Sequence, residues 1–350
     1  MSTQPQPRAA TIYPYAFAAL FWLLSIMPLC RAGLTPDAVT SGFQGRPELI
    51  EAFNSLRLDL GDRVFPTILV GQDGWLYYNA DLEIADYQHT NRMSRQALAA
   101  LQQKLDAINS SLEQKGILFV VVIAPDKGSI YPQYIPDVLK VFPGPSPLDQ
   151  FISYMRRHGQ TPIVDFRPDL RAARSDGLLY FATDIHWNQM GAYVAYAKLL
   201  SILSPRFPAL APHPISDFRI RTEGPQTRPL AAVMGMPHIL EDGPRLVPRF
   251  PVTTSIQILP VPGPIPGRTF RISTTEDRSL PRALIYHDSF FLPVLPLLEP
   301  HFSETVSISA HGTDVWDTSW VDVFHPDVVI LEFAEFDTRT AVALSVPTLR

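Results

Sequence analysis

Among its 350 residues the sequence contains one cysteine, Cys30. An internal disulfide and a metal site built on several thiolates are therefore excluded, so packing alone must stabilise the fold. The chain also lacks an excess of positive charge, because 29 Lys and Arg residues stand against 34 Asp and Glu residues, for a net charge of -5. Without a basic stripe, the sequence argues against nucleic-acid binding.

Apolar residues and prolines, by contrast, are plentiful. Hydrophobic residues make up 46% of the chain, which is enough for one large core or two smaller ones and argues against disorder. The 35 prolines are about twice an average share. Many of them fall between positions 205 and 266, where they favour loops and edge strands over helices.

The N-terminal segment carries a separate signal. Between Arg8 and Arg31 lie about 22 residues without a charge, roughly the length that spans a bilayer as a helix. We therefore expect residues 1–32 to form a signal anchor. A cleaved signal peptide ending near Ala32 and a buried core helix are the alternatives. A lipoprotein signal fits poorly because the bulky Leu29 precedes the cysteine, and the arginines at both ends leave the orientation open.

After the anchor we expect a tether over residues 33–62 and one domain over residues 63–350. Within this domain, helical and strand patterns alternate, which predicts an α/β fold with a mostly parallel sheet. Asn188 is expected to cap a helix that runs to about residue 203. The stretch from about 205 to 280 is interpreted as a Pro-rich insertion with short strands. The expected elements are a hairpin over 65–78, a helix over 94–115 that ends at Gly116 as its C-cap, the end of a second helix over 153–159, and strands at 117–124, 162–165, 253–259, 283–286, 305–309 and 328–333. The apolar stripe expected on the helix after Asn188 comprises Met190, Val194, Ala197 and Leu200.

Two distant segments, 181–188 and 284–291, carry the chemistry. Each has the pattern of a hydrophobic strand that ends in a polar turn before a helix, where α/β folds place reactive groups. Together they supply Ser289, His186 and Asp184. A serine hydroxyl is a weak nucleophile unless an imidazole takes its proton, and a carboxylate best orients that imidazole. The three residues therefore predict a serine acyl-transfer site, in which the backbone N–H of Ser289 can stabilise an oxyanion.

Each of these residues also has a purely structural interpretation. Ser289 can belong to an ordinary helix cap, Asp184 can be a turn residue, and His186 can pack beside Trp187. Lys127, at the end of a predicted strand, is either a cleft residue or an exposed lysine. The aromatic residues considered for stacking on sugars, or else for the core, are Trp75, Tyr131 and Trp187. The histidines that lack metal-ligand spacing are His301, His311 and His325, so we expect no metal site.

At these motifs the chain resembles the alginate O-acetylation proteins of the AlgJ/AlgX type, which are SGNH-hydrolase-like. An Asp-Thr-His-Trp-Asn motif is met here by residues 184–188, followed by Gly191 and Ala192, and a Gly-Asp-Ser-Phe motif is met by residues 287–290. The resemblance runs from about 65 to 335. It also includes residues 73–77, 125–127, 130–132 and 164–167.

The resemblance implies a flavodoxin-like sandwich with circularly permuted motifs and a catalytic triad of Ser289, His186 and Asp184. It implies an O-acetyltransferase that modifies an exported bacterial polysaccharide through a serine acyl-enzyme, without a cofactor. By the same analogy, the protein is anchored in the inner membrane, faces the periplasm and receives acetyl groups from a multi-pass membrane acyltransferase. The expected partners are an acetyl donor and a polysaccharide, and the candidate substrate-binding residues are Lys127, Tyr131, Trp187 and His287.

The chain departs from the family pattern at two places. His287 replaces the usual glycine before the Asp-Ser pair, and residues 228–230 read Arg-Pro-Leu where the family has Gly-Asp-Leu. These departures leave other functions open: a polysaccharide acetylesterase, a non-catalytic glycan-binding or scaffold protein of an export complex, and a metal-dependent hydrolase built on Asp184 and His186. Labelling of Ser289 by a fluorophosphonate separates catalysis from scaffolding, and chelation tests for a metal.

Overall fold

A computed structural model describes residues 46–79, 83–136, 139, 141–262, 268–309, 318–339 and 341. The chain divides into two compact units, residues 1–61 and residues 62–350. In the first unit, helix α3 (Arg46–Asp59) occupies much of the expected tether and has no buried residue. The expected anchor over residues 1–32 lies outside the described residues. Within the described ranges, every helix is too short or too polar to cross a membrane.

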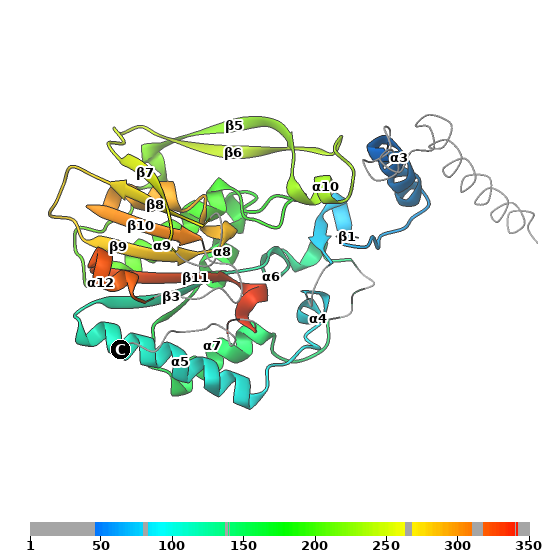
Figure 1. Ribbon diagram of the computed structural model, residues 1–350. Coiled ribbons are helices and arrows are strands. Elements are labelled where there is room, and N and C mark those ends of the chain that lie inside the picture. The colour runs from blue at the N-terminus through cyan, green and yellow to red at the C-terminus, as the bar shows by residue number, and fades with distance from the viewer. Residues whose placement is uncertain are drawn as a thin grey trace, which may run out of the picture. The chain divides into compact units, whose positions relative to one another are not determined.

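A seven-stranded sheet forms the centre of the second unit (Figure 1), with the order β4-β3-β11-β9-β10-β8-β7. From β4 to β10 the neighbouring strands are parallel, whereas β8 and β7 are added antiparallel at one edge. The mostly parallel sheet predicted from the sequence is therefore confirmed. The strands are β3 (Leu118–Ala124), β4 (Ile163–Asp165), β7 (Ser255–Pro260), β8 (Thr269–Thr274), β9 (Arg282–His287), β10 (Glu304–Ser309) and β11 (Val328–Ala334).

The order of the parallel strands confirms the flavodoxin-like, permuted topology. If the chain is read from β9 through β10 and β11 and then to β3 and β4, the spatial order becomes 2-1-3-4-5. In such sheets, ligands bind outside the carboxyl ends of the strands, at the point where the strand order reverses. Here that point lies between β9 and β11, directly next to Ser289.

Helices cover both faces of the sheet. The central strands β3 and β11 are therefore buried along almost their whole length. One face packs against α5 (Arg95–Gln114) and α7 (Pro147–His158). Ser94 caps α5, and, as predicted, Gly116 follows its end, with a φ of 76°, a conformation that favours glycine. The opposite face packs against α8 (Arg167–Ala173), α9 (Gln189–Leu203) and α11 (Leu295–Leu298).

Helix α9 begins after Asn188 as predicted, and the four residues of the expected apolar stripe all belong to or pack against the core, but the most buried face of the helix is a different one. Of the four stripe residues only Leu200 is buried, while Met190, Val194 and Ala197 are half-buried. Because α9 carries apolar residues on nearly all sides, periodicity alone does not identify the packed face. The residues buried in α9 are Gly191, Ala192, Ala195, Tyr196, Leu199, Leu200 and Leu203.

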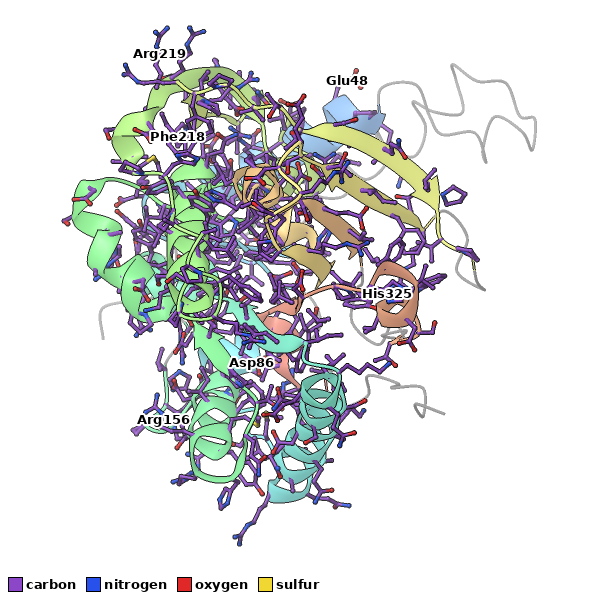
Figure 2. The ribbon with its side chains drawn as sticks, turned by 90° about the vertical axis from the view of Figure 1, so that its left-hand side faces the viewer. Glu48, Asp86, Arg156, Phe218, Arg219 and His325 are labelled. Atoms are coloured by element: carbon purple, nitrogen blue, oxygen red, sulfur yellow. The ribbon has the colours of Figure 1, made fainter. Side chains whose placement is uncertain are left out.

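The Pro-rich stretch differs from the expected insertion. Strands β5 (Phe218–Thr227) and β6 (Leu240–Pro248) form a separate hairpin of 10 and 9 residues, with α10 (Pro229–Val233) between them. Strands β7 and β8 instead extend the central sheet. Prolines are compatible with both arrangements. Along the outer edge of an edge strand the backbone N–H groups have no partner strand, so a proline there removes no hydrogen bond of the sheet. Figure 2 shows Arg219 of this hairpin pointing away from the body of the domain.

Shorter elements complete the domain. The expected hairpin over 65–78 is present as β1 (Ile68–Val70) and β2 (Leu76–Tyr78), which pair antiparallel. The other helices are α4 (Glu83–Tyr87), α6 (Lys127–Ile130) and α12 (Trp320–Phe324). The 3-10 turns are η1 (Gln72–Gly74), η2 (Pro132–Tyr134), η3 (Arg174–Asp176), η4 (Ile215–Asp217), η5 (Ser289–Phe291), η6 (Glu299–His301) and η7 (Glu335–Thr338).

Candidate active site

Ser289, His186 and Asp184 form a hydrogen-bonded chain. The Nε2 atom of His186 lies 2.8 Å from Ser289 Oγ, and its Nδ1 atom lies 2.8 Å from Asp184 Oδ1. When Nδ1 carries the proton and this N–H donates a hydrogen bond to Asp184, Nε2 is free to accept the hydroxyl proton of Ser289. The fold thus brings together residues that are 103 positions apart, in the arrangement that activates a serine nucleophile.

The turn that carries His186, residues 180–187 and called here the base-bearing turn, is closed by backbone contacts. Tyr180 and Trp187 form an isolated bridge at its two ends. Asn188 then begins α9: its Oδ1 accepts from two N–H groups of the first turn, and its Nδ2 donates to the Leu178 carbonyl. Gly191 is needed one turn later, because a Cβ atom there would collide with the Leu179 carbonyl oxygen. The Trp-Asn motif and its following glycine are therefore local supports of the turn.

Asp184 is suited to remain ionised although it is mostly buried. Burial raises the pKa of this carboxyl, but hydrogen bonds and charge attraction from His186, with backbone hydrogen bonds from His186 and Ile185, outweigh that effect. The net result is a pKa below the usual range. A negative charge next to Nδ1 stabilises the imidazolium that forms when His186 takes a proton.

The turn that carries Ser289, residues 287–291 and called here the nucleophile turn, is anchored by two buried acidic residues, Asp288 and Glu332. Asp288 is the N-cap of η5 and accepts from the N–H groups of Phe290 at 2.7 Å and Ala334 at 2.8 Å. Its own N–H donates to Glu332 Oε2 at 2.8 Å. Burial raises the pKa of both carboxyl groups, and that of Glu332 lies well above its usual value. These contacts join the carboxyl ends of β9 and β11 immediately beneath Ser289.

One side chain connects the two halves of the site. The indole N–H of Trp187 donates to the Phe290 carbonyl at 2.7 Å, so the residue after His186 is bonded to the residue after Ser289. Trp187 is only 1% exposed. It therefore fixes the separation of base and nucleophile from within the core.

The four residues predicted to bind substrate are all buried, with 3% or less of their surface exposed: Lys127, Tyr131, Trp187 and His287. None offers a surface on which a polysaccharide can lie, so this part of the prediction is corrected. Tyr131 accepts the Leu179 N–H through its hydroxyl oxygen. Trp75, the other aromatic considered, is buried and stacks on Tyr134. Sequence spacing could not distinguish these residues from exposed ones, because aromatics fill cores as readily as binding surfaces.

The family departure at His287 has a local explanation. The residue is the last of β9, and its Nδ1 donates to the Asp288 carbonyl at 2.7 Å. Position 287 is not among the described residues with a positive φ. A glycine is therefore not required there, and the imidazole occupies buried space without changing the strand.

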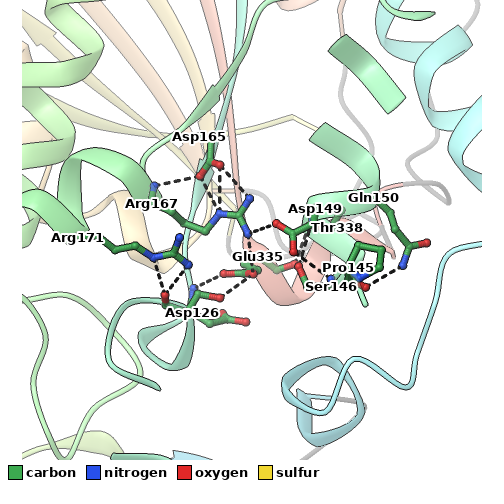
Figure 3. A network of polar contacts seen from close by, with 11 residues as sticks. Asp126, Pro145, Ser146, Asp149, Gln150, Asp165, Arg167, Arg171, Glu335 and Thr338 are labelled. Carbon is green, nitrogen blue, oxygen red and sulfur yellow. Dashed lines mark hydrogen bonds and ion pairs between the residues drawn. The ribbon is translucent and has the colours of Figure 1, made fainter. Parts of the chain in front are cut away.

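A second polar network, which sequence reasoning did not identify, stabilises the sheet beside the site (Figure 3). The guanidinium of Arg167 donates three hydrogen bonds to Asp165 and one, at 2.8 Å, to Asp149. Glu335 accepts from the Asp126 N–H at 2.9 Å. Burial lowers the pKa of Arg167, but hydrogen bonding and attraction from the three carboxylates outweigh this and raise it. The network ties together the carboxyl ends of β3, β4 and β11.

An open groove borders the base-bearing turn. Phe181 and residues 176–178 form one side, and residues 220–222 and 241–244 of the β5–β6 hairpin form the other. Leu178 and Ile220 are 50% and 55% exposed in this region. Unlike the buried candidates, these residues present both apolar and polar surface to a ligand.

Known proteins share this fold and part of this sequence. The chain is 29% identical over 148 residues to the probable alginate O-acetylase AlgJ of Pseudomonas syringae pv. tomato, a match that covers 41% of this chain and 35% of that protein. A DHHW family protein from Eubacterium siraeum superposes with a TM-score of 0.58 at 14% identity, covering 80% of this chain and all of that one. Bacillus cereus PatB1 superposes with a TM-score of 0.57 at 14% identity, covering 77% and 96%.

These matches have defined limits. The chain spans about a third of the length of the curated relatives it matches. The two structural likenesses, at 14% identity, concern the fold. A family model described as the SGNH hydrolase-like domain of the acetyltransferase AlgX matches residues 68–249, which include Asp184 and His186 and stop before Ser289. Because this span is more than half of the chain, the protein belongs to the AlgX-type family of SGNH hydrolase-like domains.

Proposed function

We propose that the protein is an O-acetyltransferase that modifies an exported polysaccharide through an acetyl-enzyme on Ser289. The observation that carries the proposal is the hydrogen-bonded chain from Ser289 through His186 to Asp184 at the carboxyl edge of the sheet. This chain supplies a nucleophile, a base and the group that orients the base.

The reaction follows from these positions. As Ser289 Oγ bonds to the acetyl carbon, His186 Nε2 takes the hydroxyl proton, and this proton is then given to the leaving group of the donor. A sugar hydroxyl next transfers its proton to Nε2 and attacks the acetyl carbon, and the bond to Oγ breaks with return of the proton to Ser289. The negative oxygen in each step needs a donor, and the N–H of Ser289, at the first position of η5, is suited to this role.

The substrate is proposed from the relatives' names and the groove. The curated relatives are named probable alginate O-acetylases, which supports an alginate-like polymer as acceptor. The groove between Phe181 and the β5–β6 hairpin is the proposed surface for the polymer, because Phe181 is three positions before Asp184 in the same turn and the groove is open to solvent. Residues 1–32 are proposed to anchor the chain in the inner membrane with this domain in the periplasm, where a multi-pass acyltransferase would deliver acetyl groups.

An acetylesterase is the second candidate. The side chain of His186 is 22% exposed, so water can approach the base. Hydrolysis would use the same acetyl-enzyme with water in place of the sugar hydroxyl. The two activities are separated by measuring whether acetate release from a generic ester falls, and acetyl transfer rises, as a polysaccharide acceptor is added.

The triad is tested by substitution. Ser289→Ala should abolish acetyl release from a generic ester, and His186→Ala should lower kcat by roughly 10²–10⁴-fold because an unassisted serine is a poor nucleophile. Asp184→Asn should lower kcat mainly through the wrong imidazole tautomer. Ser255→Ala, at an exposed serine that begins β7 and lies outside both motifs and the groove, is the matched control and should retain full turnover. Wild-type turnover in all three triad variants would refute the catalytic assignment and favour a scaffold role.

A further inference from the structure

Two charged side chains hold the turn that precedes His186, and they do so from opposite sides. From one side, Lys127 Nζ donates to the carbonyl oxygens of Ala182 at 2.8 Å and Asp184 at 2.7 Å, with that of Phe181 at 3.4 Å. An ammonium group has three protons to donate, and three carbonyls of this turn face it. Lys127 is 2% exposed.

Aromatic rings complete the surroundings of this ammonium group. Lys127 Nζ lies 5.4 Å from the centre of the Trp75 ring and 5.0 Å from that of Tyr77, within the range of cation–π attraction. Both rings belong to the small β1–β2 hairpin region. The lysine is thus enclosed by carbonyl oxygens and aromatic faces, and it has no surface with which to bind a substrate.

From the other side, Glu241 of strand β6 binds the N–H groups of the same turn. Its Oε1 accepts from the Ala182 N–H at 2.6 Å, and its Oε2 accepts from the Thr183 N–H at 2.8 Å and the Thr183 hydroxyl at 2.6 Å. Glu241 comes from the β5–β6 hairpin, 57 residues after Asp184. No motif in the sequence marks it.

The two sets of contacts are ordered along the backbone. The peptide unit between Phe181 and Ala182 has its oxygen towards Lys127 and its N–H on Glu241. The next unit, between Ala182 and Thr183, has the same orientation. Each peptide dipole therefore lies between a cation at its oxygen and an anion at its N–H, so reversal of either plane would set like partial charges against both side chains.

We propose that Lys127 and Glu241 are positioning residues that fix Asp184, and through it His186, for reaction with Ser289. The inference rests on the proposed function, since it concerns the same acetyl-enzyme. Neither side chain touches the reacting atoms. Lys127 holds the carbonyl of Asp184 itself, and Glu241 holds the two residues before it. Displacement of a catalytic group by about 1 Å can lower the rate of a reaction by 10²-fold, so loosening this turn should reduce the turnover of a small ester without changing the binding of that ester.

The test is the rate at which a fluorophosphonate labels Ser289, together with kcat and KM for p-nitrophenyl acetate. Glu241→Gln and Lys127→Met in the full chain should lower the labelling rate and kcat by about 10- to 100-fold and leave KM within about twofold. Thr183→Val, which loses one of the three donors to Glu241, should give a smaller decrease.

Asp106→Asn provides a matched control. Asp106 also accepts from two successive backbone N–H groups and one threonine hydroxyl, those of Gln160 and Thr161, at the turn before β4. Its substitution removes the same kind of contact away from the base-bearing turn. Labelling of this control at the wild-type rate, with slow labelling of Glu241→Gln, supports the proposal.

The remaining outcomes are distinct. Absence of labelling in the wild-type protein would overturn the proposed function itself. Labelling of folded Glu241→Gln and Thr183→Val at the wild-type rate would overturn only the positioning role, and these two variants decide the question if Lys127→Met does not fold. Equal slowing in Asp106→Asn would also overturn it, because the effect would then be general loosening of the domain.

Discussion

Replacement of Glu332 by glutamine should change how the stability of the protein depends on pH. Glu332 lies in β11, is 2% exposed, and accepts the N–H of Asp288 beneath the nucleophile turn. Burial raises its pKa well above the usual value, and the nearby Asp288 carboxylate raises it further. The folded protein therefore keeps a proton on Glu332 at a pH where the unfolded chain releases it.

The sign and size of the effect follow from this difference. An unfolded glutamate titrates near a pKa of about 4.3. Above that value the unfolded state binds fewer protons than the folded state, so the free energy of unfolding falls as pH rises until the folded pKa is reached. While the pH lies between the unfolded and the folded pKa, the limiting slope from this one group is about 1.4 kcal/mol per pH unit. Glutamine keeps an acceptor for the Asp288 N–H but has no proton to lose.

Urea unfolding between pH 5 and pH 7, followed by tryptophan fluorescence, measures the effect. As pH rises, the wild type should lose unfolding free energy relative to Glu332→Gln, by up to about 1.4 kcal/mol per pH unit. Any constant cost of the buried amide cancels in this comparison. Thr305→Val, a buried substitution on β10 that does not titrate, should differ from the wild type by a constant amount. A pH-independent difference for Glu332→Gln would refute the assignment of a retained proton.

Two further outcomes are expected. Gly191→Ala should destabilise the domain by about 1–3 kcal/mol in thermal or urea unfolding, because the added methyl meets the Leu179 carbonyl and Trp187 Cβ, whereas Gly224→Ala, where a Cβ meets nothing within 4 Å, should change stability little. Removal of residues 1–32 should release the protein from membranes while the remaining chain stays folded; a truncated protein that still sediments with washed membranes would contradict the proposed anchor.

Local signals in the sequence were sufficient for the elements that carry the site. Asn188 was identified as a helix cap from its residue type and position, and its side chain accepts the two expected N–H groups. Gly116 marked the end of α5 because glycine adopts the left-handed conformation found there. Ser289 follows the buried strand β9 as expected, at the carboxyl edge of the sheet. The strand expected before His186 is absent, because Tyr180 forms only an isolated bridge to Trp187 there, so His186 lies in a turn.

The features that were missed depend on tertiary contacts. Lys127 was considered either a cleft residue or an exposed one, because a lysine is seldom enclosed by carbonyls and aromatic rings. Glu241 had no signal at all, since it lies in a Pro-rich stretch and reaches the turn only through the β5–β6 hairpin. The packed face of α9 was also hidden, because its apolar residues do not fall on a single stripe.

The permuted chain order places different demands on the two halves of the site. Ser289 follows a strand near the end of the chain, whereas His186 precedes a helix near its middle, so no short connection sets their separation. Each half is instead held by its own buried charges: Asp288 and Glu332 under the serine, Lys127 and Glu241 around the turn before the histidine. The Trp187 indole then joins the halves through the Phe290 carbonyl. Because these contacts depend on spatial order along the sheet edge and not on sequence order, the same arrangement of serine, histidine and aspartate can be built from a permuted chain.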